Sequence, residues 1–159
     1  MPYAPDTGAI ATPIGMVVVS ADRGQLTSVR ILPSAEPVYS GSSEIVQLAL
    51  TQLAGYFAGS RTTFDLPLAP AATRRGAALR QGMIQIGFGE TCSYSELAAV
   101  LKSGSRAIGQ ACARNPFPIL VPCHRVLASS GLGNYSAGEG ILTKHWLLDF
   151  ERAPIGDLL

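Results

Sequence analysis

Residues that bind metal ions or form disulfides are scarce in this sequence. Its 159 residues include three cysteines, with no C-x-x-C spacing, and two histidines: Cys92, Cys112, Cys123, His124 and His145. Because the first third of the chain contains neither residue type, no Cys/His zinc site can form there. The odd number of cysteines, together with the lack of a charged segment followed by an apolar run at the N-terminus, predicts a reducing, cytoplasmic location.

Charge and long apolar runs are also scarce. Charged residues make up 14% of the chain, the net charge is +1, and no segment approaches the ~20 apolar residues of a membrane span. The charge is uneven, with three basic and five acidic residues in 1–72 but nine and six in 73–159. A polyanion should therefore dock, weakly, on the C-terminal half. With 47% hydrophobic residues, the chain can still bury a core without disulfides or metal.

The first half of the chain is predicted to combine strands with one helix. Apolar runs and alternation predict elements at 16–20, 26–32, 42–57 and 61–68, of which 42–57 is the helix and the first two strands form a β-hairpin. Ser42 or Ser43 can cap the helix, and Gly59 ends it. Prolines and alanines up to Thr73 predict a linker, which divides the chain into an N-terminal α/β domain, 1–72, and a C-terminal domain, 73–159.

The second half is predicted to be helical, with helices at 75–86, 94–101 and 106–114. Ser93 and Glu96 have capping-box spacing before the second helix, and Ser105 can cap the third. A short connection containing glycine joins these two helices, which is the layout of a helix-turn-helix. Many helical hairpins with this layout bind no nucleic acid, so both interpretations stay open.

The third of these helices is thin. Small residues occupy alternate positions of it: Ala107, Gly109, Ala111 and Ala113. Before Arg114, its only long polar side chains are Arg106 and Gln110. Such a helix either packs tightly against its own domain or lies in a nucleic-acid groove, with Arg106 reaching into it.

Cys123 lies directly beside His124 in the stretch Val-Pro-Cys-His-Arg. Pro122 fixes its own φ, so we expect the thiol to be held on a stiff strand-to-turn element. A thiolate is a strong, soft nucleophile near pH 7, and an adjacent histidine can take its proton. The alternative interpretation is that Cys123 is a small buried hydrophobic residue, as most free cysteines are.

Five motifs occur in one order and at tight spacing in the second half. They are Asn115-Pro116, Pro118-Ile119-Leu120, Pro122-Cys123-His124-Arg125-Val126, Gly133-Asn134-Tyr135-Ser136, and Trp146-Leu147-Leu148 with Glu151. Together they resemble the O6-alkylguanine-DNA alkyltransferase family, also called methylated-DNA–protein-cysteine methyltransferases, over residues 89–151. The resemblance implies an α+β fold: a small N-terminal antiparallel β-sheet and helix domain, ribonuclease H-like, and a C-terminal helical domain with a winged-helix-like helix-turn-helix.

The resemblance also implies a chemistry. An alkyl group would move once, and irreversibly, from O6 of guanine (and from O4 of thymine as a second substrate) in duplex DNA to Cys123, after the base is flipped out of the helix. His124 would be the base, acting through a bridging water, and Glu151 would orient and polarise it. A thioether offers no route to hydrolysis, so one turnover per molecule is expected. No cofactor is implied, and we expect a monomer.

Further roles follow from the resemblance alone. Arg106 would fill the vacated base stack, and Tyr94 would crowd the phosphate and donate its hydroxyl to the flipped guanine. Ser136 would offer its backbone N–H to O6, and the Val126 carbonyl would accept from the guanine amine, as would that of Cys123. Asn115 would brace the turn before the reactive cysteine. Tyr135 and Gln110 complete the expected substrate contacts.

Three positions depart from the family pattern. Arg80 replaces an aromatic residue, Gly87 replaces a proline, and Ala137 stands where glycine is common, beside the expected pocket. Two rival functions are also open. A lesion sensor would bind alkylguanine without reacting, although relatives of that type lack the cysteine, and a cysteine hydrolase would need an oxyanion hole and multiple turnover.

Overall fold

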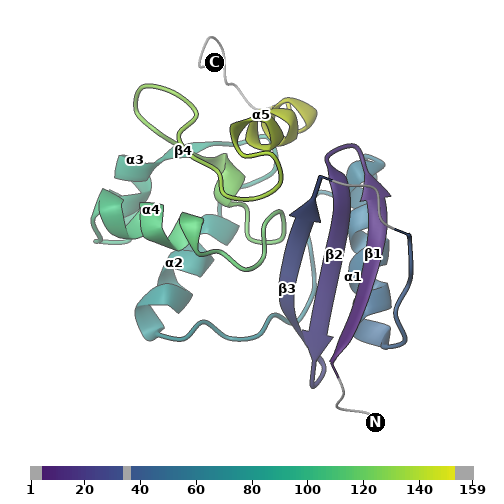
Figure 1. Cartoon of the computed structure of the whole chain (residues 1–159). Helices are drawn as coiled ribbons and strands as arrows, with labels where there is room; N and C mark the ends of the chain where they lie inside the picture. Colours follow the sequence, from purple (N-terminus) through teal and green to yellow (C-terminus); the bar gives the residue numbers. More distant parts are fainter. Residues whose placement is uncertain (1–4, 34–36, 153–159) are drawn as a thin grey trace. The chain divides into compact units, whose positions relative to one another are not determined.

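The computed structural model describes residues 5–33 and 37–152, and its contacts divide the chain into two compact units, Met1–Ala69 and Pro70–Leu159. The first unit contains a three-stranded antiparallel sheet in the order β1-β2-β3, formed by Asp6–Thr12, Gly15–Asp22 and Gln25–Leu32. Helix α1, Glu44–Phe57, packs across the sheet (Figure 1).

The predicted hairpin and the predicted helix of this unit are confirmed. Strands β2 and β3 form the hairpin, and Ser43 caps α1 by accepting a hydrogen bond from the backbone N–H of Val46 at 3.3 Å. The buried face of α1 includes Leu53 and Tyr56, both 0% exposed, whereas Leu48 on the same helix is 46% exposed. The sequence analysis missed β1, because its residues, DTGAIAT, lack the apolar alternation of a typical strand and include glycine and two alanines, which are depleted in strands.

The strand predicted over 61–68 is wrong. That segment forms only one isolated bridge, between Leu26 and Leu68. Pro67 and Pro70 flank the bridge, and because proline has no backbone N–H, the ladder cannot extend past them. The buried side chain of Gln52 supplies the missing partners instead: it donates to the Asp65 carbonyl at 3.1 Å and accepts from the Asp65 N–H at 2.9 Å.

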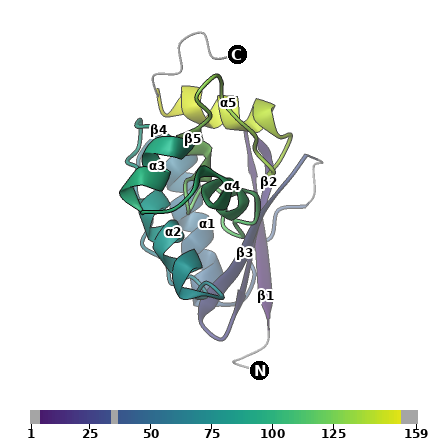
Figure 2. The ribbon, with the colours of Figure 1, turned by 90° about the vertical axis from the view of Figure 1, so that its left-hand side faces the viewer.

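The second unit contains the remaining helices and a minimal parallel sheet (Figure 2). In chain order these are α2 (Arg74–Ile84), β4 (Cys92–Ser93), α3 (Tyr94–Val100), α4 (Ser105–Ala113), a 3-10 turn (Cys123–Arg125), β5 (Val126–Leu127) and α5 (Ile141–Phe150). Strand β4 pairs with β5, which places the start of α3 beside the segment that follows Cys123. At this level, the mixed α/β organisation with an antiparallel sheet is confirmed.

The helix ends of this unit follow mostly local signals. The Ser93–Glu96 capping box is present, with hydrogen bonds of 3.0 and 3.1 Å. Ser105 is not the cap of α4, because it is the first helical residue. Gly104 occupies the N-cap position, and since glycine has no side chain, no side-chain hydrogen bond caps this helix. Gly82 in α2 packs closely against Leu101, since a Cβ there would lie 2.5 Å from a methyl group of that side chain, which would have to shift.

Part of the core of the second unit is formed by the residues that directly precede Cys123. Phe117 and Ile119, like Val121, are each 1% exposed. Ile119 adopts φ of 75°, a conformation that costs a β-branched residue about 1–3 kcal/mol. Among the described residues, no helix is long and apolar enough to cross a membrane.

Candidate active site

Cys123 begins the 3-10 turn and is 4% exposed. Its backbone N–H donates to the Val121 carbonyl at 2.8 Å, and the Arg125 N–H donates to the Pro122 carbonyl at 3.0 Å. Pro122 itself has φ of −80°. The thiol is therefore fixed by backbone geometry at a tight turn that leads into β5, a shorter element than the strand-to-turn expected from the sequence.

Asn115 links the end of α4 to this turn. Its side-chain amide donates to the Val121 carbonyl at 2.9 Å and to the Cys123 sulfur at 3.2 Å, while its Oδ1 accepts from the Phe117 N–H at 2.9 Å. Burial raises the pKa of the Cys123 thiol, and the hydrogen bond from Asn115 acts in the opposite direction because it favours the thiolate. The same amide thus holds the backbone and favours the reactive form of sulfur.

Lys144 is a buried cation that the sequence analysis missed. It lies on α5, is 0% exposed, and donates to the carbonyls of Val126 at 2.6 Å and Asn134 at 3.3 Å. Burial lowers its pKa to about 8, although charge on the nearby Cys123 raises it. Its positive charge in turn acts to lower the pKa of that thiol. The available signal was a lone lysine within the apolar helix segment ILTKHWLL.

His124, Arg125 and Glu151 form a buried ionic network on the other side of the turn. His124 Nε2 lies 2.9 Å from Glu151 Oε2, and Arg125 donates to the two carboxylate oxygens from Nε at 2.8 Å and from Nη2 at 3.0 Å. Burial raises the pKa of Glu151, but the hydrogen bonds from His124 and Arg125 outweigh it and lower that pKa to about 2. Arg125, which the sequence analysis did not select, also donates to the Ile86 carbonyl at 2.6 Å.

This network sets the tautomer of His124. A carboxylate with so low a pKa only accepts hydrogen bonds, so Nε2 must carry the proton and Nδ1 the lone pair. Nδ1 is buried and has no hydrogen-bond partner within 5–33 and 37–152. Burial lowers the pKa of His124, and the hydrogen bond that the ring donates to Glu151 opposes this effect. The ring is therefore a neutral base held ready to accept a proton at Nδ1.

Two tyrosines have a raised pKa, because burial disfavours their charged form and charge on Cys123 acts in the same direction. Tyr94 is the first residue of α3, and burial raises its pKa to about 12, so its hydroxyl keeps its proton. The Nζ of Lys144 lies 5.8 Å from the centre of its ring. Burial also raises the pKa of Tyr135, whose hydroxyl has no hydrogen-bond partner in the part of the chain that the structure describes.

The remaining selected residues lie on exposed surfaces. Arg106 and Gln110 are exposed on α4, four residues apart. Ser136 is exposed, and its hydroxyl donates to the Ala113 carbonyl at 3.3 Å, which ties the loop before α5 to the end of α4. The structure thus brings the expected catalytic residues together and leaves the expected helix contacts facing outward.

Comparison with known proteins gives one consistent result. Residues 77–153 match the model of the 6-O-methylguanine DNA methyltransferase, DNA binding domain. The chain is 34% identical over 148 residues to the methylated-DNA–protein-cysteine methyltransferase of Methanosarcina acetivorans, covering 88% of this chain and 94% of that protein. It is 37% identical over 154 residues to the protein of the same name from Mycobacterium tuberculosis, covering 91% and 92%.

Solved structures agree with the sequence matches. The Mycobacterium tuberculosis OGT in complex with DNA aligns with a TM-score of 0.77 at 36% identity, over 94% of this chain and 95% of that one. The likeness therefore extends across both compact units and beyond the residues that carry the motifs.

Proposed function

Because this chain belongs to the methylated-DNA–protein-cysteine methyltransferase family, we propose that it repairs O6-alkylguanine in duplex DNA by moving the alkyl group to Cys123. It is a DNA-repair enzyme of the suicide type. The observation that carries the assignment of the acceptor is the buried thiol of Cys123, which accepts a hydrogen bond from Asn115 and directly precedes a histidine paired with a carboxylate.

The roles of the polar groups follow from their hydrogen bonds. His124 Nδ1 takes the thiol proton through a water, and Glu151 stabilises the imidazolium that forms. Arg125 keeps Glu151 ionised by binding both of its oxygens. The sulfur electron pair then forms the S–C bond while the bond between the alkyl carbon and O6 breaks. The electrons of the broken bond stay on the guanine. The guanine finally takes up the proton that the thiol lost. Asn115 and Lys144 stabilise the thiolate.

Four residues serve the flipped base. Tyr94, whose pKa is raised to about 12, stays protonated and donates to the leaving guanine. The Val126 carbonyl already accepts from Lys144, but a carbonyl has two lone pairs and can also accept from the guanine amine. Ser136 offers its backbone N–H to O6, and Tyr135 closes the pocket.

Helix α4 is the DNA-binding element in this proposal. A Cβ added at Gly109 would meet no atom within 4 Å, so the packing of its own unit does not require a glycine there. This observation favours the nucleic-acid interpretation of the thin helix, since a missing side chain lets another backbone approach. Arg106 then enters the duplex to fill the space of the flipped base, and Gln110 contacts the adjoining groove.

Several finer assignments belong to the same proposal. We place an N-terminal domain at 1–72, ribonuclease H-like in fold, and the DNA-binding and alkyl-acceptor domain at 73–159, with a winged-helix-like helix-turn-helix. The chain acts as a monomer in the cytoplasm, on O6-alkylguanine in duplex DNA. It reacts once, because nothing in the site displaces an alkyl group from a thioether.

Intact-mass measurement after incubation with duplex DNA containing O6-methylguanine tests this proposal. One added methyl per molecule, mapped to Cys123, is expected, while Cys123→Ser binds the lesion without a gain in mass. Cys92→Ser is the matched control, since Cys92 is the most exposed of the three cysteines and should leave the gain unchanged. Binding without a gain by the wild type would identify a sensor, and repeated turnover of an ester would identify a hydrolase.

A further inference from the structure

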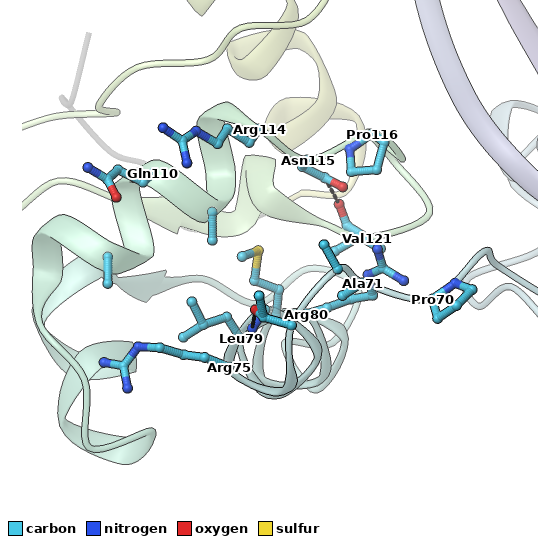
Figure 3. A pocket seen from close by; sticks show the side chains of 16 residues that line it. Pro70, Ala71, Arg75, Leu79, Arg80, Gln110, Arg114, Asn115, Pro116 and Val121 are labelled. Carbon is cyan, nitrogen blue, oxygen red and sulfur yellow. Dashed lines mark hydrogen bonds between the residues drawn. The ribbon is translucent and has the colours of Figure 1, made fainter.

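A groove between α2 and α4 adjoins the site described above and shares Asn115 and Val121 with it. It is a cavity of about 590 Å³, lined by sixteen residues from the segment before α2, from α2 itself, from α4 and from the segment that follows α4. Its floor is apolar and includes Leu79, Met83 and Val121. Figure 3 shows α2 on one side of this space and α4 on the other.

The charged groups in the groove are all of one sign. Three arginines line it, Arg75 and Arg80 from α2 and Arg114 from the end of α4, and the sixteen lining residues include neither aspartate nor glutamate. In Figure 3, Arg75 extends from α2 toward the same side of the groove as Gln110 and Arg114 extend from α4. Arg75 is held in place by Ser103, whose hydroxyl accepts from its guanidinium at 2.8 Å. The groove is thus built for an anionic ligand.

Arg80 contributes differently from the other two arginines. Its guanidinium lies 5.2 Å from the centre of the Phe117 ring, and burial lowers its pKa. This half-buried cation stacks on an aromatic face at the inner end of the groove, whereas Arg75 and Arg114 are exposed. The two exposed arginines are therefore the ones that can reach an approaching anion.

The arginines of the groove continue the polar stripe of α4. Arg106, Gln110 and Arg114 follow one another at steps of four residues, each step advancing about 6 Å along the helix and turning about 40° around it. Gln110 and Arg114 line the groove, and Arg106 does not. The stripe therefore begins on the outward face of α4 and turns into the groove.

The position of the groove suggests its occupant. A helix placed in the minor groove of DNA has a sugar-phosphate strand along each side, and side chains flanking the helix meet the phosphates. The α2–α4 groove flanks α4 on one side, its apolar floor suits deoxyribose, and its exposed arginines suit phosphate. An acidic protein segment would match the charge equally well but would have no relation to the stripe on α4.

We propose that the α2–α4 groove holds the sugar-phosphate backbone of one strand of the bound duplex, with Arg75 and Arg114 each contacting a phosphate. This inference rests on the proposed function, because it requires α4 to lie against DNA. It adds two phosphate contacts that none of the family motifs in this chain contains, one of them on a helix outside the helix-turn-helix.

The test is the salt dependence of binding to a short, undamaged duplex, measured by fluorescence anisotropy. Each phosphate contact contributes about −0.9 to the slope of log affinity against log salt. Arg75→Gln and Arg114→Gln should each flatten the slope by about that amount. When the salt concentration rises fourfold, the fall in affinity of each variant should therefore be about 3.5-fold smaller than that of the wild type. The double variant should show about 12-fold less loss.

Two sets of controls accompany these variants. Arg30→Gln removes an exposed arginine of β3 and should leave the slope unchanged. Arg75→Lys and Arg114→Lys keep the charge and should keep the slope, which separates a lost phosphate contact from a disturbed fold.

The inference is overturned if both glutamine variants keep the wild-type slope, or if the lysine variants lose it as well. It is also overturned if a polyglutamate peptide binds the wild type but not the double variant while the duplex slope is unchanged, because the groove would then take an acidic protein. Methyl uptake by the wild type from a lesion duplex tests the proposed function separately. Uptake together with unchanged slopes would reject the groove alone.

Discussion

Replacing Glu151 with glutamine tests the buried network most directly. In the folded chain Glu151 is 2% exposed and binds both His124 and Arg125. Its pKa falls from the ordinary 4.5 to about 2, which corresponds to about 3 kcal/mol of folding free energy at neutral pH. An independent comparison agrees, since breaking a buried ion pair by removing one partner costs about 3–5 kcal/mol. Glu151→Gln should therefore lower the free energy of unfolding by about 3 kcal/mol at pH 7.

The pH dependence has a definite sign. A carboxyl whose pKa is lowered by folding contributes stability above its unfolded value of 4.5, and that contribution is lost as pH falls through about 2. The difference between wild type and variant should thus shrink to about 1 kcal/mol at pH 3. Urea unfolding can be followed by the fluorescence of the single tryptophan, Trp146, which stacks on Phe150 in α5.

The same variant should also react slowly. Glutamine can donate to His124 Nε2 and so favour the tautomer with its proton on Nδ1, which is the wrong one for accepting the thiol proton. Loss of the orienting carboxylate in a serine protease lowers the rate about 10⁴-fold, and we expect a fall of at least about 10²-fold in methyl transfer. Glu139→Gln, at an exposed carboxylate, is the control and should change stability by less than about 0.5 kcal/mol. A loss below about 1 kcal/mol for Glu151→Gln, or a loss that is constant with pH, would refute the reasoning.

Three further predictions concern the site and α4. Gly109→Ala should raise the free energy of unfolding by about 0.8–1 kcal/mol, measured by urea unfolding, because the added Cβ meets open space. The same variant should bind duplex DNA more weakly, measured by fluorescence anisotropy. Unchanged binding would contradict the DNA interpretation of α4. Asn115→Ala should raise the pKa of Cys123 by removing a hydrogen bond to sulfur, and so slow iodoacetamide labelling of that thiol at pH 8; equal labelling would remove Asn115 from thiolate stabilisation. The methyl-transfer rate should rise with pH as the thiolate forms and then level off or fall as Lys144 deprotonates above its pKa of about 8. Lys144→Met should lack this change at high pH. An identical pH profile for the wild type and the variant would exclude a role for Lys144 in stabilising the thiolate.

Elements with local signals could be predicted from the sequence. The β2–β3 hairpin follows from alternation around a turn, and α3 follows from its capping box. The β4–β5 pair could not be predicted, because each strand has two residues and exists only through pairing between Cys92–Ser93 and Val126–Leu127, which are distant in sequence. For 61–68, apolar composition indicated a strand, but the flanking prolines and the side chain of Gln52 determine its backbone partners.

The candidate site also divides into residues that local sequence motifs identify and residues that only tertiary contacts identify. A short motif places Cys123 beside His124, and the resemblance added Glu151, which the structure brings to within 2.9 Å of the histidine. Lys144 and Arg125 were missed because a buried cation is recognised by its tertiary partners, here carbonyls and a carboxylate from other elements. The roles of these residues in the reaction stay predictions until the variants are measured.

The left-handed backbone at Ile119 has a consequence for the motion of the reactive segment. A residue that pays 1–3 kcal/mol for its conformation regains that energy whenever the surrounding loop opens. The hydrogen bond from the Val121 amide to the Phe117 carbonyl spans this bend, so its deuterium uptake should be faster than burial alone implies. Because the Asn115 amide binds both the Val121 carbonyl and the Cys123 sulfur, we expect an opening that displaces Val121 also to weaken the hydrogen bond to the sulfur.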